Sequence, residues 1–256
     1  MGKNKLARWQ ELDSFANVIQ PETAAVAVND HPVKGAWKEN VFKNHNPIIL
    51  ELGCGKGEYT IGLAEMFPEN NFIGVDIKGA RMWRGAKTSN ERKMTNVAFL
   101  RTRIEFIDRF FSEDEIDEIW ITFPDPHAGM SNSNKRLTSP WYLKKYIRLL
   151  KNNGIIHLKT DNAELFQYTR SVIKSNNLEE LFSSDNLYSE ELKPTDIIVG
   201  VSDSLSLPDN RWLFYHNILS IKTFYEKQFL AKGMKITYLA FKLNKNSFPS
   251  HADEEA

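Results

Sequence analysis

Three carboxylates lie where chemistry could be done, each at the end of an apolar segment: Asp76, Asp125 and Asp161. Asp125 stands between two prolines, which fix φ on both sides and remove two backbone donors. Its carboxylate is therefore expected to have little freedom at the mouth of a strand. A fixed carboxylate can stabilise positive charge that develops on a substrate, or accept hydrogen bonds. The simpler alternatives are a turn begun by Asp125 and a helix N-cap at Asp161.

A glycine-rich loop, ELGCGKG, precedes these carboxylates and contains Glu51, Gly53, Gly55 and Gly57. Glycine lets the backbone approach a ligand closely, and a following helix offers free N–H groups. The spacing does not match a P-loop, and Glu58 occupies the third glycine site of a dinucleotide fingerprint. S-adenosylmethionine fits better, because Glu51 can help hold its cationic end. Asp76, 25 residues later, can accept from both ribose hydroxyls. A structural turn capped by Glu51 is the alternative.

Strand-like and helix-like segments alternate five times, which predicts an α/β fold with βαβ units and a parallel sheet. The strand segments are near-continuous apolar runs, as strands covered on both faces require. They are 47–53, 71–77, 96–100, 118–124 and 154–160, and the helix segments are 59–68, 79–94, 104–111, 139–153 and 163–176. Ser139 and Pro140 are typical of a helix start. In open α/β sheets ligands bind at the carboxyl ends of the strands, so the loop and the carboxylates should meet there.

The chain has 256 residues, enough for one large α/β domain or two small ones. We expect an N-terminal arm with little regular structure over 1–45 and a main domain over 46–243. That domain should have an insertion at about 188–212, and a disordered tail should follow over 244–256. A helix is predicted at 217–233 and an alternating strand at 234–243.

The cysteine content and the apolar segments limit the class of protein. The single cysteine, Cys54, excludes a disulfide framework and fits a reducing cytosol. No apolar run is long enough to span a membrane, and the N-terminus has no signal-peptide pattern. No metal site is predicted. These features favour a cytoplasmic protein without a membrane partner.

Five segments in a fixed order resemble the bacterial type of tRNA (guanine-N7)-methyltransferase. They are the loop at 51–57, Asp76, FPDP at 123–126, LKTDN at 158–162 and TFYE at 223–226. The resemblance covers roughly residues 45 to 243. It implies a Rossmann-like, S-adenosylmethionine-dependent methyltransferase fold whose mostly parallel sheet has an antiparallel C-terminal strand. It also implies methyl transfer to N7 of guanine at position 46, in the variable loop of tRNA, without an obligate protein partner.

The resemblance and the chemistry together predict roles for the site residues. Guanine N7 has a lone pair and no proton, so positioning should dominate the reaction. Asp125, which contacts the cofactor in the family, would stabilise the cationic guanine. Asp161 would accept from guanine N1–H and N2–H₂. The resemblance also implies late substrate contacts from Thr223, Tyr225 and Glu226.

Two departures from the family pattern concern the substrate and the adenine. Gly129 stands where the family has a lysine, and Lys135 or Arg136 of the same loop could replace it. Arg103 stands where the family has Asp or Asn for the adenine amine. Arginine cannot accept a hydrogen bond, so we expect the backbone at 103–104 to hold the adenine. His127 needs no catalytic role.

The charges are segregated along the chain although 33 basic and 33 acidic residues cancel. The segment 77–103 has eight Lys and Arg against one Glu, and 126–160 has seven against no acid. The segments 104–118 and 179–203 each have seven acids against one basic residue. We expect both basic segments to border the cofactor cleft and attract tRNA, with the acidic segments elsewhere. Solvated helix faces are the alternative.

Two other functions stay open at the level of sequence. One is a catalytically weak or idle protein that binds tRNA or the cofactor, because of the two departures. The other is a methyltransferase that acts on a small molecule or a protein. Cofactor-dependent methylation of tRNA separates the three.

Overall fold

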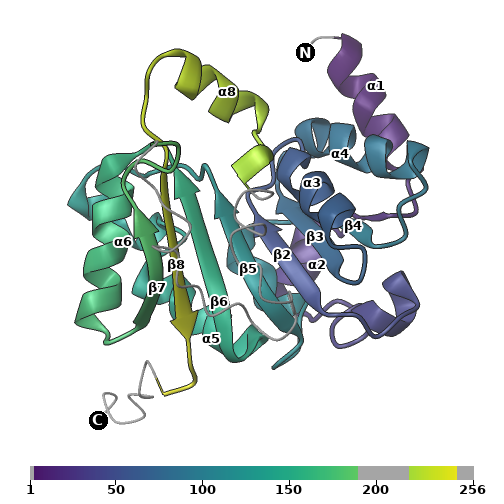
Figure 1. Cartoon of the computed structure of the whole chain (residues 1–256). Coiled ribbons are helices and arrows are strands. Elements are labelled where there is room, and N and C mark those ends of the chain that lie inside the picture. The colour runs from purple at the N-terminus through teal and green to yellow at the C-terminus, as the bar shows by residue number, and fades with distance from the viewer. Residues whose placement is uncertain (1–2, 190–218, 247–256) are drawn as a thin grey trace.

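The computed structural model describes residues 3–189 and 219–246, built around one eight-stranded sheet (Figure 1). The strand order is β1-β4-β3-β2-β5-β6-β8-β7. The strands are β1 Val18–Ile19, β2 Ile48–Leu52, β3 Asn71–Asp76, β4 Val97–Arg101, β5 Ile116–Thr122, β6 Leu150–Thr160, β7 Glu179–Ser184 and β8 Thr237–Leu243. Neighbours from β1 to β6 are parallel, whereas β8 is antiparallel to both β6 and β7. The predicted fold class is therefore confirmed.

Helices cover both faces of this sheet, as the near-continuous apolar strands require. They are α1 Lys3–Leu12, α2 Thr23–Val28, α3 Glu58–Met66, α4 Gly79–Glu91, α5 Pro140–Leu149, α6 Ala163–Ser175 and α8 Phe224–Ala231. Shorter helical turns lie at Trp37–Phe42, Ile104–Arg109 and Met130–Lys135. None of the described helices is long and apolar enough to cross a bilayer.

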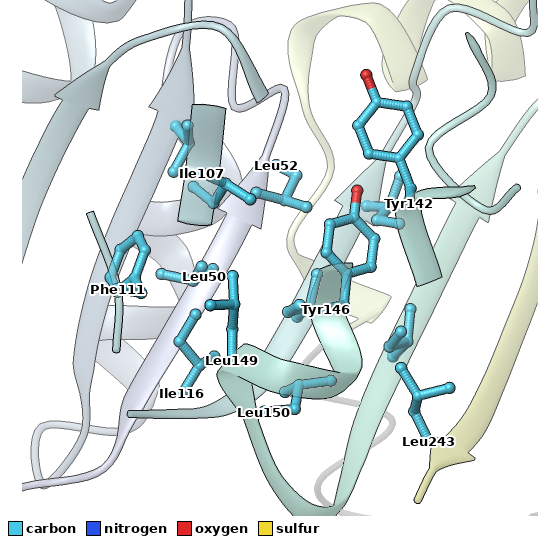
Figure 2. Close-up of a cluster of buried hydrophobic side chains, with 14 of the residues drawn as sticks. Leu50, Leu52, Ile107, Phe111, Ile116, Tyr142, Tyr146, Leu149, Leu150 and Leu243 are labelled. Carbon is cyan, nitrogen blue, oxygen red and sulfur yellow. The ribbon is translucent and has the colours of Figure 1, made fainter. Parts of the chain in front are cut away.

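Alternate residues of β2 enter two separate cores. Leu50 and Leu52 pack with Tyr142 and Tyr146 of α5 in one core, which Figure 2 shows. Ile49 belongs to the other core, on the side of α3 and α4. Because successive side chains of a strand point to opposite faces, one apolar segment supports both helical layers. Packing of helices on both faces of the sheet holds the carboxyl ends of the strands in place, where the ligand site is expected.

The N-terminal segment is more regular than the sequence predicted. Residues 1–45 were expected to have little regular structure, yet α1, β1 and α2 lie there, and β1 extends the sheet by pairing with β4. Leu12 and Trp37 are buried, and the Trp37 indole donates to the Phe110 carbonyl at 2.8 Å. The strand β1 has two residues and α2 has six, so neither is long enough for a periodic pattern to be recognised.

Two C-terminal elements also differ from the prediction. The helix expected at 217–233 is interrupted: residues 219–220 are helical, 221–223 are not, and α8 begins at Phe224 with Thr223 as its N-cap. The strand β7 was missed, because its residues alternate poorly between exposed and buried positions. Most of the predicted insertion and tail, over 190–218 and 247–256, lies outside the described residues. Ser139 does cap α5 and Pro140 opens it, as predicted.

Candidate active site

A cavity of about 730 Å³ opens where the sheet predicts a ligand site, at the carboxyl ends of β2 to β6. Each of these five strands contributes a lining segment, and α8 closes one side. The predicted site residues that line it are Gly53, Asp76, Arg103, Asp125, Lys135, Asp161 and Tyr225. The structure therefore brings together residues from the loops that follow five different strands. The volume lies in the range of small-molecule sites.

The three loop glycines have positive φ, between 55° and 78°, but they serve different purposes. A Cβ on Gly53 would meet nothing within 4 Å, so this residue leaves its side of the cavity open. A Cβ on Gly57 would lie 2.6 Å from the Phe99 ring, so Gly57 is needed for packing. Gly55 donates its N–H to Asp76. Of the three, only Gly53 lines the cavity.

Asp76 joins the glycine loop to the start of α4. One carboxylate oxygen accepts from the N–H of Gly55 at 2.9 Å, and the other accepts from the N–H of Lys78 at 2.7 Å. Each oxygen keeps a second lone pair for a ligand in the cavity. The side chain is thus fixed in position and still able to accept two further hydrogen bonds.

Glu51 is placed differently from the prediction, because it is buried beneath the loop rather than lining the cavity. Its carboxylate accepts from the Thr60 N–H at 2.8 Å and from the hydroxyls of Thr60 and Thr122. Burial raises the pKa of Glu51 to about 7, against the lowering effect of these hydrogen bonds. In this geometry Glu51 ties the loop to α3 and β5.

We expect the ligand-free protein to lose stability between about pH 4.5 and 7 relative to a Glu51→Gln variant. The pKa of Glu51 is raised on folding, so its stabilising contribution is complete below pH 4.5 and is lost as pH rises through about 7. Urea unfolding of both proteins across this range measures the difference. The same pH dependence in both would show that another group is responsible.

Asp125 projects into the cavity mouth from a tight turn. Its side chain is 76% exposed, and its Oδ1 accepts from the His127 N–H at 3.1 Å. Phe123 and His127 on either side have positive φ, at 48° and 44°. The turn alternative is therefore correct, and the same turn directs the second carboxylate oxygen away from the backbone contact. The turn and a functional role are compatible.

Asp161 is not the N-cap of α6, so the alternative that it serves only as a helix cap is wrong. The N-cap of α6 is Asn162, whose side chain accepts from the Leu165 N–H at 2.8 Å. Partial burial raises the pKa of Asp161 above its ordinary value. Asp161 is therefore available to a ligand, and its pairing with a donor inside the cavity would offset the cost of its burial.

Arg136 does not present a free cation, so the sequence prediction for it is corrected. Its side chain is 2% exposed and its guanidinium donates to Glu164 at 2.6 Å and to the carbonyls of Pro126 and His127. It thereby positions the loop that follows Asp125. Lys135 is exposed, contacts the Asn132 side chain and lines the cavity.

Arg103 lies beside the cavity with its guanidinium turned to Glu105. The two side chains are 2.9 Å apart, and this pairing raises the pKa of Arg103. Thr102 and Ile104 also line the cavity, so backbone groups are present beside the end of β4. Glu105 is an acid of the cavity wall that sequence reasoning missed.

The TFYE segment divides into structural and exposed residues. Thr223 and Glu226 form a reciprocal capping box at the start of α8. Glu226 is fully buried and pairs with Lys159 at 2.7 Å, a partner that sequence reasoning missed. Of these two predicted substrate contacts, Glu226 is therefore inaccessible, and the Thr223 side chain is already hydrogen-bonded within the capping box. Tyr225 is 39% exposed and lines the cavity.

The two basic segments have different surroundings, which corrects the predicted charge distribution. In 126–160, most cations meet acids, and three of these acids belong to 104–118: Lys145 pairs with Asp108, Arg148 with Glu113 and Lys151 with Asp117. The acidic segment therefore lies beside this basic one and not elsewhere. In 77–103, Lys78, Arg81 and Arg84 form no ion pair among the described residues. On α4, Arg81 and Arg84 are unpaired within the described part of the chain, whereas Lys87 pairs with Glu11 at 2.8 Å.

Known proteins are similar to this chain over most of its length. Residues 45–205 match a family model described as "Putative methyltransferase". The chain is 48% identical to the tRNA (guanine-N(7)-)-methyltransferase of Bacteroides fragilis, covering 95% of this chain and 87% of that one. It is 45% identical to the enzyme of the same name from Christiangramia forsetii, covering 94% and 98%.

Solved structures show the same fold at low sequence identity. The 16S rRNA methyltransferase KamB superposes with a TM-score of 0.57 at 12% identity, covering 84% of this chain and 95% of that one. An antibiotic-related methyltransferase superposes with a TM-score of 0.54 at 13% identity, covering 90% and 98%.

Proposed function

The chain belongs to the tRNA (guanine-N(7)-)-methyltransferase family, and from this premise we propose how its cavity serves the reaction. The protein transfers a methyl group from S-adenosylmethionine to N7 of guanine in tRNA. The single observation that supports our assignment of the site is the convergence of Asp76, Asp125 and Asp161 on one cavity beside the open face of Gly53.

The cavity suits a cationic cofactor with a ribose. Gly53 leaves room for a ligand close to the loop backbone, and the wall has four carboxylates together with four basic side chains. Asp76 would accept from the two ribose hydroxyls, since each of its oxygens keeps a free lone pair. Backbone groups at 103–104 would hold the adenine. Glu51 would act on the cationic end through the loop that it supports, because its own carboxylate is buried.

When bound, the cofactor supplies an electrophilic methyl group. Asp125 would lie beside the guanine that accepts it and stabilise the positive charge that develops on the ring. No protein base has to remove a proton first, because N7 carries a lone pair. Asp161 would orient the guanine by accepting from N1–H and N2–H₂, and Tyr225 would contact the base from α8. These roles concern positioning and electrostatics.

The finer features of the reaction are also proposals. We assign the target to position 46 of the variable loop, with Lys135 as a phosphate contact in place of the family lysine. Both ligands would be bound by residues of a single chain, so no obligate protein partner is required. The reaction would occur in the cytoplasm, where bacterial tRNA is found.

Transfer of label from S-adenosylmethionine tests the proposal against its two alternatives. We expect one methyl group per molecule of unmodified tRNA, with N7-methylguanosine as the labelled nucleoside. Binding of both ligands without transfer would favour an idle binding protein. Transfer to a protein or small molecule in preference to tRNA would identify a different methyltransferase.

A further inference from the structure

A second hollow, of about 260 Å³, lies on the outer side of the glycine loop between α3 and α4. Gly85 of α4 touches the loop there, because a Cβ on Gly85 would lie 2.7 Å from the Lys56 carbonyl oxygen. This contact closes the floor. The rims bear Lys56, Arg84 and Arg92. We refer to this hollow as the α3–α4 groove.

Two cations of the α3–α4 groove have no acidic partner among residues 3–189 and 219–246. Arg92 is paired with Glu65, and Glu58 accepts the Phe224 N–H at 2.9 Å. Lys56 and Arg84 form no ion pair, and Arg84 is exposed. An unpaired surface cation can meet a phosphate without losing an acidic partner. Lys56 and Arg84 therefore offer two unpaired cations to an anionic ligand, and the carboxylate of Glu58 is the one acid of the lining without an ion pair among the described residues.

Two exposed aromatic side chains, Phe224 and Tyr225, lie between features of the two hollows: Lys56 of the α3–α4 groove lies over the Phe224 ring, and Tyr225 lines the cavity. They are 45% and 39% exposed, and their rings meet edge to face at 5.7 Å. The Lys56 Nζ lies 3.8 Å from the centre of the Phe224 ring, and the Arg81 guanidinium lies 5.8 Å from that of Tyr225. Exposed aromatic faces beside cations are the surface on which single-stranded nucleic acids stack their bases.

We infer that the α3–α4 groove binds the sugar–phosphate backbone of the single-stranded tRNA segment next to the target guanosine. Phe224 stacks on a neighbouring base, and Lys56 and Arg84 contact successive phosphates. The inference rests on the proposed function, because the RNA on either side of the target guanosine must run out of the cavity while the guanine base is bound inside it. Exposed rings beside unpaired cations favour RNA over an acidic peptide, since every nucleotide supplies both a base that can stack and a phosphate.

Replacement of both groove cations tests the electrostatic part. The Lys56→Ala/Arg84→Ala protein should bind tRNA about tenfold more weakly at moderate salt. The slope of log K against log salt concentration should be shallower by about 1.4, because each of the two lost single-strand phosphate contacts contributes about 0.7. In Arg84→Ala alone, the S-adenosylmethionine affinity and the single-turnover rate of methylation at saturating tRNA should both stay at the wild-type level. The matched control is Lys144→Ala/Arg148→Ala on α5, which should keep the full slope.

An unchanged slope in the groove variant, or an equal loss in the α5 control, would overturn the inference. Because Lys56 belongs to the glycine loop, Arg84→Glu on the outer face of α4 decides the case if the double variant loses cofactor affinity. Arg84→Glu should weaken tRNA binding more than Arg84→Ala does. If both variants bind tRNA with the wild-type affinity, the inference is overturned. If the wild-type protein transfers no methyl to tRNA, the proposed function itself fails.

Substitution of Phe224 tests the stacking part with the same binding assay. Phe224→Leu keeps an apolar side chain without a ring face and should weaken tRNA binding at least about fivefold. Phe224→Tyr keeps the ring and should bind as the wild type does. Equal affinity of the Leu and Tyr variants would contradict stacking at this position.

Discussion

Asp125→Asn is expected to lower kcat about a hundredfold, which corresponds to roughly 2.7 kcal/mol of transition-state stabilisation. Asparagine can still accept from the His127 N–H, so the turn that directs the side chain should survive. Only the negative charge beside the developing cation is removed. Single-turnover methylation of tRNA at saturating cofactor measures the effect on the chemical step.

Cofactor affinity separates this electrostatic role from a structural one. Asp125→Asn should bind S-adenosylmethionine nearly as well as the wild type, since the charge acts on the guanine. Asp125→Ala also removes the hydrogen bond to the His127 N–H and should lose more S-adenosylmethionine affinity than Asp125→Asn does. A wild-type single-turnover rate in Asp125→Asn would show that the carboxylate serves only the turn.

Asp76→Ala is expected to weaken S-adenosylmethionine binding by about 1.5–3 kcal/mol, or roughly 10- to 150-fold. The substitution removes the acceptor proposed for the ribose hydroxyls. It also leaves the N–H groups of Gly55 and Lys78 without their carboxylate partner, which loosens the loop. Calorimetric titration with the cofactor measures the loss.

Asp76→Asn is the matched control, because its amide oxygen can retain one of the backbone contacts. Its affinity should fall between those of the wild type and Asp76→Ala. Unchanged affinity in the Ala variant would exclude the ribose contact. Tighter binding of NAD than of S-adenosylmethionine by the wild type would favour the dinucleotide interpretation of the glycine loop.

The sheet and the carboxylates at its edge could be predicted because their signals are local. Apolar strand segments alternate with amphipathic helices, and Asp76, Asp125 and Asp161 follow strand ends directly. Parallel strands then place these residues together without knowledge of any long-range contact. Helix α8 was predicted too long because a capping box is a short signal inside a longer helical pattern.

Burial and pairing of charged residues could not be predicted, since sequence shows a charge without its partner. Arg136 reads as a loop cation but is buried against Glu164. Glu226 was predicted to contact the substrate but is buried with Lys159. The same limit explains why the positive face was assigned equally to two segments. Long-range pairing neutralises most cations of 126–160, whereas Arg81 and Arg84 of α4 form no ion pair within the described part of the chain.

The most direct test of the central claim is the position of the methyl group in tRNA. An unmodified transcript incubated with the protein and S-adenosylmethionine can be cleaved chemically at N7-methylguanine and resolved by length. We expect one cleavage, at position 46 of the variable loop, and about a hundredfold slower appearance of it with Asp125→Asn. A methyl group on another atom or at another position, or equal cleavage by both proteins, would contradict the account.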